Sequence, residues 1–182
     1  MQLPLSTPRA GASPIAARIA MSSWTATSSL SAIVLALAGL RRVGLDHETT
    51  ELLPIEQFIP AAGQGAIALE ARESDLEVLA ILAAVDDLGA RVAVTAERAL
   101  LHELEGGCSL PLGAYAEIIG SALRLHGQVT SLDGATNLHL ERTGQADHPE
   151  RLALEVANAI RSSGGDRILH EITQTRATGT PS

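Results

Sequence analysis

The sequence of 182 residues contains no lysine, and all of its 13 basic residues are arginines. A reaction that needs a lysine amine, such as Schiff-base chemistry, is therefore excluded for this chain acting by itself. Acidic residues outnumber basic ones by 21 to 13, for a formal net charge of −8. This balance argues against nucleic acid and against an anionic membrane surface as partners. Aromatic residues make up only 2% of a chain that is 46% hydrophobic, so the predicted core is aliphatic and rich in alanine.

Long apolar runs and the common metal or nucleophile patterns are also missing. The longest apolar run, 32–40, is far shorter than the roughly 20 residues that a membrane-spanning helix needs. The histidines show no H-x-H or H-x-x-x-H spacing, so no metal site is predicted. No Ser-His-Asp or nucleophile-elbow pattern is present. The single cysteine, Cys108, excludes an intrachain disulfide and suits a reducing compartment.

Cys108 lies in the stretch LEGGCSLPLGAYA, which follows a segment with helical periodicity at 91–105. Gly106 and Gly107 are expected to end this helix, because glycine readily adopts the left-handed conformation of a helix C-cap. Taken by itself, a lone cysteine is more often a buried and inert small hydrophobe. The negative end of the helix dipole also disfavours a thiolate here. A functional Cys108 is therefore interpreted as an attachment point and not as a turnover nucleophile.

The predicted fold class is α+β. Apolar and polar residues alternate along 122–130, which is typical of a half-buried strand, and Asp133-Gly134 is a hairpin signal after it. A three-stranded antiparallel sheet with helices on one face is therefore expected. The predicted helices are 74–88, 91–105 and 149–162. Ser74 is the predicted N-cap of the first. The predicted strands of this sheet are 114–119, 122–130 and 138–143, and a further strand-like run covers 66–70.

Four stretches in order resemble the porphobilinogen deaminase family, also called hydroxymethylbilane synthase. They are AIVLALAGLRRVGL, LLPIEQFIPAAGQGAIALEAR, VTAERALLHELEGGC and the Pro111-x-Gly113 that follows the cysteine. The resemblance implies that Cys108 carries a dipyrromethane cofactor through a thioether, within a loop that includes Gly106, Gly107 and Ser109. It also implies that the family's reaction condenses four porphobilinogen molecules into hydroxymethylbilane with loss of ammonia.

The resemblance further implies a substrate-binding role for Arg42, Gln64 and Gly65. Arg42 matches a family arginine that binds carboxylates, and Gln64 and Gly65 line the cleft at the crossover between the first two domains. From the residues alone, Arg42 is a solvated arginine near a helix C-terminus, and the glycines beside Gln64 form a hinge. The acidic pair 86–87 is interpreted as a solvated helix end, because the family's catalytic aspartate belongs to a first domain that is not recognisable here.

Four segments are predicted. Residues 1–31 are a non-family, disordered segment; 32–88 are a remnant of the α/β second domain with the crossover; 89–172 form the cofactor-attachment domain; and 173–182 are a disordered tail. The first segment is acid-poor and rich in serine. It could be a transit peptide, a disordered tail without a targeting signal, or the start of a truncated or frame-shifted product, and the last interpretation is favoured. The expected location is the cytoplasm, or an organelle if 1–31 is a transit peptide.

The expected small-molecule partner is porphobilinogen, and the expected oligomeric state is a monomer, with a separate amino-terminal half as a possible protein partner. Because the first domain is not recognisable, the chain by itself is expected to be inactive. Two alternatives are a non-catalytic fragment that binds its other half, and an α+β binding domain in which Cys108 is only structural.

Overall fold

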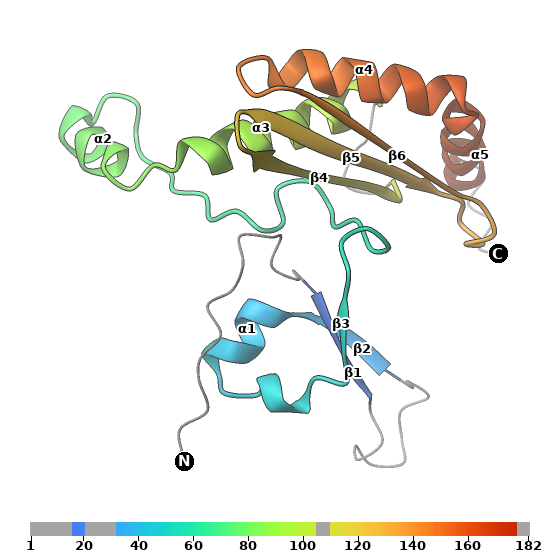
Figure 1. Cartoon of the computed structure of the whole chain (residues 1–182), viewed down its shortest axis with the longest axis horizontal. Coiled ribbons are helices and arrows are strands. Elements are labelled where there is room, and N and C mark those ends of the chain that lie inside the picture. Colours follow the sequence, from blue (N-terminus) through green and yellow to red (C-terminus); the bar gives the residue numbers. More distant parts are fainter. Residues whose placement is uncertain (1–15, 21–31, 105–109, 178–182) are drawn as a thin grey trace. The chain divides into compact units, whose positions relative to one another are not determined.

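The computed structural model describes residues 16–20, 32–104 and 110–177 and divides the chain into two compact units, Met1–Phe58 and Ile59–Ser182 (Figure 1). The boundary predicted at 88/89 differs from this division and stays a prediction. The elements of the first unit are β1 (Ala16–Ala20), β2 (Ala32–Ala36), α1 (Leu37–Arg42), a 3-10 turn (Asp46–Glu48) and β3 (Glu51–Leu53). Those of the second unit are α2 (Leu76–Ala83), α3 (Leu88–Glu103), β4 (Leu112–Ile119), β5 (Ala122–Thr130), β6 (Asn137–Gln145), α4 (Pro149–Ser162) and α5 (Gly165–Ala177).

In the first unit, β1 is the central strand of a three-stranded antiparallel sheet with the order β2-β1-β3. Leu37 and Leu40 of α1 are buried. The expectation of disorder over 1–31 does not hold for Ala16–Ala20, which forms β1. The partners of this strand, β2 and β3, come later in the chain, so the hydrogen bonds that order it are not visible in its local composition.

The connection from the first sheet to α3 contains less regular structure than predicted. The strand-like run 66–70 has no regular structure, and it pairs with none of the strands in the described part of the chain. α2 begins after Asp75, whose carboxylate accepts the amide of Val78 at 3.1 Å, so Asp75 and not Ser74 is the N-cap. The helix ends at Ala83 instead of continuing to 88, and none of its residues is buried. Most helical stability in proteins comes from packing of one face, so without such packing this two-turn helix gains no stabilisation for further turns.

α3 starts earlier than predicted because the acidic pair 86–87 begins it. Asp87 is the N-cap and accepts the amide of Ala90 at 2.9 Å. Asp86 accepts two hydrogen bonds from the Arg91 guanidinium, the shorter at 2.6 Å. Both residues are exposed at a helix end, as interpreted, but they belong to the start of α3 and not to the end of the preceding helix. Gly89 lies inside the first turn of α3.

The predicted α+β class and the C-terminal antiparallel sheet are confirmed. β5 is the central strand, and it pairs with β4 and β6 in register with Leu125 opposite Ala116 and Arg142. The predicted ranges 122–130 and 149–162 match β5 and α4, whereas β4 and β6 are longer than expected. α5 continues to Ala177, so the tail expected to be disordered from residue 173 begins in a helix.

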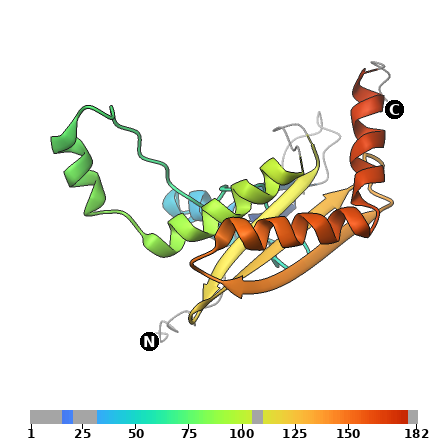
Figure 2. The ribbon, with the colours of Figure 1, turned by 90° about the horizontal axis from the view of Figure 1, so that it is seen from above.

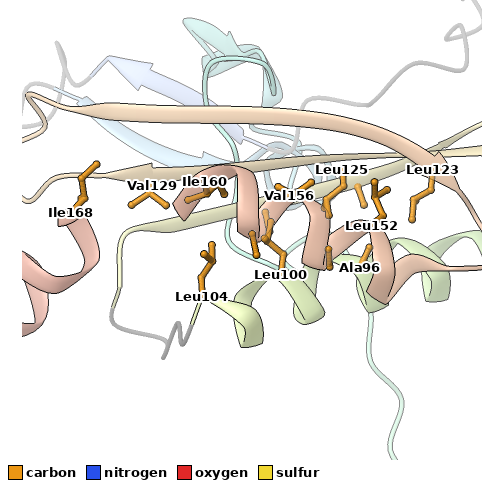
Figure 3. Packing of buried hydrophobic residues seen from close by; sticks show 14 of the residues in the cluster. Ala96, Leu100, Leu104, Leu123, Leu125, Val129, Leu152, Val156, Ile160 and Ile168 are labelled. Atoms are coloured by element: carbon orange, nitrogen blue, oxygen red, sulfur yellow. The ribbon is translucent and has the colours of Figure 1, made fainter. Parts of the chain in front are cut away.

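Both α3 and α4 cover the same face of this sheet and lie side by side across it (Figure 2). The side chains of α3, α4 and β5 meet between the helices and the sheet in one aliphatic core, with Ile168 of α5 at its edge (Figure 3). The predicted aliphatic and alanine-rich core is thus located in the second unit. Its largest fully buried side chains are Leu100, Leu123, Leu125, Val129, Val156, Ile160 and Ile172.

The opposite face of the sheet is polar, but one of its residues is buried. His126 on β5 is only 3% exposed, and its Nδ1 lies 3.2 Å from Nε2 of His139 and 3.6 Å from the carboxylate of Glu141. Burial lowers the pKa of His126, an effect that the neighbouring Glu141 carboxylate partly opposes. The alternation along β5 identifies His126 only as part of the polar face. Its burial follows from its place on the central strand, between Tyr115 of β4 and Glu141 of β6.

Candidate cofactor-attachment site

The four predicted cofactor-loop residues, Gly106, Gly107, Cys108 and Ser109, lie outside the described residues. The structure does describe the two ends between which they are placed. On the helix side, Leu104 is 5% exposed and belongs to the core. On the strand side, the amide of Leu112, the first residue of β4, donates to the carbonyl of Leu110 at 2.8 Å.

Two longer-range contacts fasten these ends to the rest of the domain. The Arg161 guanidinium of α4 donates to the carbonyl of Glu103, where α3 ends. A cation at this position is favourable because it satisfies a terminal carbonyl and meets the negative end of the helix dipole. On the other side, the amide of Thr130 donates to the carbonyl of Pro111 at 3.2 Å. The cysteine segment is therefore attached at both ends to the packed part of the domain.

Gln64 and Gly65 lie in the same unit, between two overlapping turns. The amide of Gln64 donates to the carbonyl of Ala61 at 3.2 Å, and that of Ala66 donates to the carbonyl of Gly63 at 3.1 Å. Gly63 has a φ of +73°, which glycine adopts without strain, so the unusual backbone angle expected of a hinge is found here. Both Gln64 and Gly65 are exposed. The side-chain amide of Gln64 is thus accessible to a ligand, whereas its backbone amide is used in the first turn.

This segment, 59–64, lies along the free edge of β4. The amide of Ala114 donates to the carbonyl of Pro60 at 2.9 Å. Gly113 has no room for a side chain, because a Cβ there would lie 2.8 Å from the carbonyl oxygen of Ile59. The crossover and the strand that follows the cysteine loop are therefore in direct main-chain contact.

Glu97 of α3 is a buried residue that the sequence reasoning missed. Its side chain is 6% exposed, and its two carboxylate oxygens accept the amides of Gly63 at 2.7 Å and Ala116 at 2.8 Å. A signal for it was present in the sequence. Glu97 lies four residues after Ala93 and three before Leu100, so it falls on the apolar face of the helix.

Burial raises the pKa of Glu97, although its two amide hydrogen bonds act in the opposite direction. The folded protein thus holds a proton on Glu97 more tightly than the unfolded chain does. The stability contributed by this proton is complete below the ordinary value of 4.5 and is lost as pH rises through the raised folded value.

The pH dependence of stability tests this assignment. In Glu97→Gln the side chain is neutral at every pH, so this titration is removed. The variant also loses one hydrogen bond, but that loss is the same at every pH. We therefore expect the difference in free energy of unfolding between the wild type and Glu97→Gln to move in favour of the wild type as pH falls from neutral toward 4.5. Urea unfolding of both proteins across this range measures it. A difference that moves toward the variant on acidification would show that the folded pKa is lowered.

Arg42 belongs to the first unit. It ends α1 and is exposed, beside Arg41 in the last turn of the helix. Within residues 16–20, 32–104 and 110–177, no group of three or more His, Cys, Asp or Glu side chains is placed to bind a metal ion. No helix in the described part of the chain is both long enough and apolar enough to cross a membrane.

The fold and these contacts define an α+β domain in which a cysteine-containing segment connects a helix to an edge strand, and this strand contacts a glycine-containing crossover. A family model described as "Porphobilinogen deaminase, C-terminal domain" matches residues 91–162. A second, "Porphobilinogen deaminase, dipyromethane cofactor binding domain", matches residues 14–80. The chain therefore belongs to the porphobilinogen deaminase family, as predicted. The second match begins before Ala32, where the sequence analysis placed the start of the resemblance.

Curated relatives agree with the family models. A porphobilinogen deaminase of Brevibacillus brevis is 43% identical over 148 residues, which are 81% of this chain and 47% of the relative. One of Roseiflexus castenholzii is 47% identical over 138 residues, or 76% of this chain and 45% of the relative. One of Carboxydothermus hydrogenoformans is 39% identical over 143 residues, or 79% of this chain and 46% of the relative. The chain thus spans about half the length of the curated relatives it matches.

Proposed function

We propose that this chain supplies the cysteine-bearing part of a hydroxymethylbilane synthase, which condenses four porphobilinogen molecules head to tail with release of ammonia. The observation that carries the proposal is the attachment of the cysteine segment at both ends, at Glu103 by Arg161 and at Pro111 by Thr130. Such a segment suits a permanent anchor. Membership of the family and the matched cofactor-binding domain support the same function.

Cys108 is the residue that would hold the cofactor, since its thiol is the only one in the chain. A dipyrromethane joined to it by a thioether supplies a primer that stays bound while the product grows. Gly106, Gly107 and Ser109 flank Cys108 in the sequence, where glycine contributes no side chain and serine contributes a hydroxyl. Gln64 and Gly65 are exposed on the crossover that contacts β4, and this position supports a role in lining the cleft.

Arg42 is proposed to bind carboxylates of porphobilinogen or of the growing chain. The acetate and propionate groups of a pyrrole suit the two-pronged hydrogen bonding of a guanidinium. The exposure of Arg42 at the end of α1 leaves its donors accessible. We further propose that the protein acts in the cytoplasm as a monomer. Its relatives are bacterial, and an unpaired cysteine suits a reducing compartment.

Intact mass spectrometry tests the attachment site. We expect the chain, co-expressed with the amino-terminal half of the Brevibacillus brevis relative in cells that make tetrapyrroles, to exceed its sequence mass by one dipyrromethane. Cys108→Ala and Cys108→Ser should both remove this addition completely, because a serine hydroxyl is a much weaker nucleophile than a thiol. Titration of free thiols should show the reciprocal change, with one thiol per chain only when the cofactor is absent.

An adduct that maps to any other residue would contradict the assignment of Cys108. An unmodified, unreactive thiol in every condition would favour the alternative in which the chain is a binding domain and Cys108 is structural. Co-purification of the two halves without any adduct would favour the non-catalytic fragment.

A further inference from the structure

We propose that Glu97 is a positioning residue that holds Gln64 and Gly65 in place beside the domain that carries the cysteine loop. This inference rests on the proposed function for its meaning in catalysis, but its structural content is independent of that function. One carboxylate joins three parts of the chain that matter for the site. These are α3, which leads into the cysteine loop, β4, which leaves it, and the crossover at Gly63.

The two hydrogen bonds hold the chain directly before Gln64 and at the edge of β4. Gly63 is the residue immediately before Gln64, and its amide is bound at 2.7 Å. Ala116 lies on the free edge of β4, two residues after Ala114. The amide of Ala114 donates to the carbonyl of Pro60. The crossover is therefore held by alternate edge amides of β4, one directly through Pro60 and one through the Glu97 carboxylate. Gln64 and Gly65 are the next two residues after Gly63, which the Glu97 carboxylate holds.

Glu97 is an unusual residue for the apolar face of a helix. Burying a carboxylate is costly unless its interactions compensate, and an apolar residue of similar size often stabilises a fold as well or better. The pKa of Glu97 is raised, so the cost of burying its charge exceeds the gain from its two amide hydrogen bonds. A core-facing leucine or methionine would satisfy the apolar face of α3 but would leave two amides without an acceptor. The carboxylate therefore provides the two acceptors that set the position of the crossover, which no apolar residue could provide.

Amide hydrogen exchange in the ¹⁵N-labelled whole chain tests the proposal. In Glu97→Gln, a side-chain amide replaces one acceptor oxygen and confronts a backbone N–H with another donor. We expect exchange at Gly63 and Ala116 to become faster by about tenfold or more, with Gln64 following, while Leu125 of β5 keeps its protection. Glu155→Gln is the matched control, since it removes one negative charge from the exposed surface of α4 and should leave all these amides unchanged.

A functional measurement separates positioning from a purely structural role. Under the co-expression conditions described above, Glu97→Gln should reduce the yield of the Cys108 adduct at temperatures well below its own melting temperature, where the variant is fully folded. Unchanged exchange at Gly63 and Ala116, or faster exchange throughout β4, β5 and α4, would overturn the proposal. Absence of any adduct in the wild type would count against the proposed function alone, because the exchange result still decides whether Glu97 holds the crossover.

If Glu97→Gln does not fold, the wild type provides the test by itself. The amide proton shifts of Gly63 and Ala116 should titrate together with one midpoint above 4.5, because both amides are bound to the same carboxylate. Separate midpoints, or no titration of the Gly63 amide, would show that Glu97 does not hold the crossover in solution.

Discussion

Replacing Leu125 by alanine is expected to lower the free energy of unfolding by about 2–5 kcal/mol. Leu125 is fully buried on the central strand β5, where its side chain points into the core shared with α3 and α4 (Figure 3). Removing it deletes apolar contacts and leaves a cavity that helices on one side and a sheet on the other cannot close without moving. Because typical domains are stable by only about 5–15 kcal/mol, this is a large part of the total.

Urea unfolding followed by circular dichroism measures this loss, and Leu76→Ala is the matched control. Leu76 on α2 is 76% exposed, so its truncation is expected to change stability by less than about 0.5 kcal/mol. Equal losses for the two variants would mean that α2 is packed against a partner in solution. A negligible loss for Leu125→Ala would contradict the core described here.

Limited proteolysis is expected to remove the region around α2 and leave a resistant core that starts between Asp86 and Arg91 and contains Cys108. The residues from 66 to 85 expose large apolar side chains and lack buried ones, whereas α3 is capped by Asp87 and packs onto the sheet. Local opening near α2 therefore breaks few contacts, while opening within the core requires unfolding of the domain. Hydrogen exchange should differ between the two regions by a factor of about 1,000 or more.

Mass spectrometry of the proteolytic fragments locates the boundary, and exchange measured on the same sample gives the protection of each segment. Gly63 lies in the crossover and Ala114 contacts it. Both should be protected from exchange, because the amide of each is hydrogen-bonded within the second unit. Strong and uniform protection from residue 66 to residue 85 would contradict the prediction. If that protection weakened on dilution, a second copy of the chain would be the partner that covers α2.

The amino-acid sequence by itself determined the C-terminal domain to a large extent. The alternation along 122–130 and the proline-initiated helix 149–162 were sufficient to predict β5 and α4, because both patterns depend on neighbours a few residues apart. The family was likewise recognised from contiguous stretches around Cys108, and the family models confirm it. The roles of Arg42, Gln64, Gly65 and the four cysteine-loop residues stay predictions.

The tertiary structure decided the features that depend on residues far apart in the chain. β1 is ordered by two strands that follow it, and the run 66–70 is irregular because none of the described strands pairs with it. Glu97 is the sharpest case. Its place on the apolar face of α3 is visible in the sequence, but the amides that it binds lie 34 and 19 residues away. Whether a buried carboxylate finds partners is settled by main-chain groups that every residue possesses, and so only the folded chain shows which ones they are.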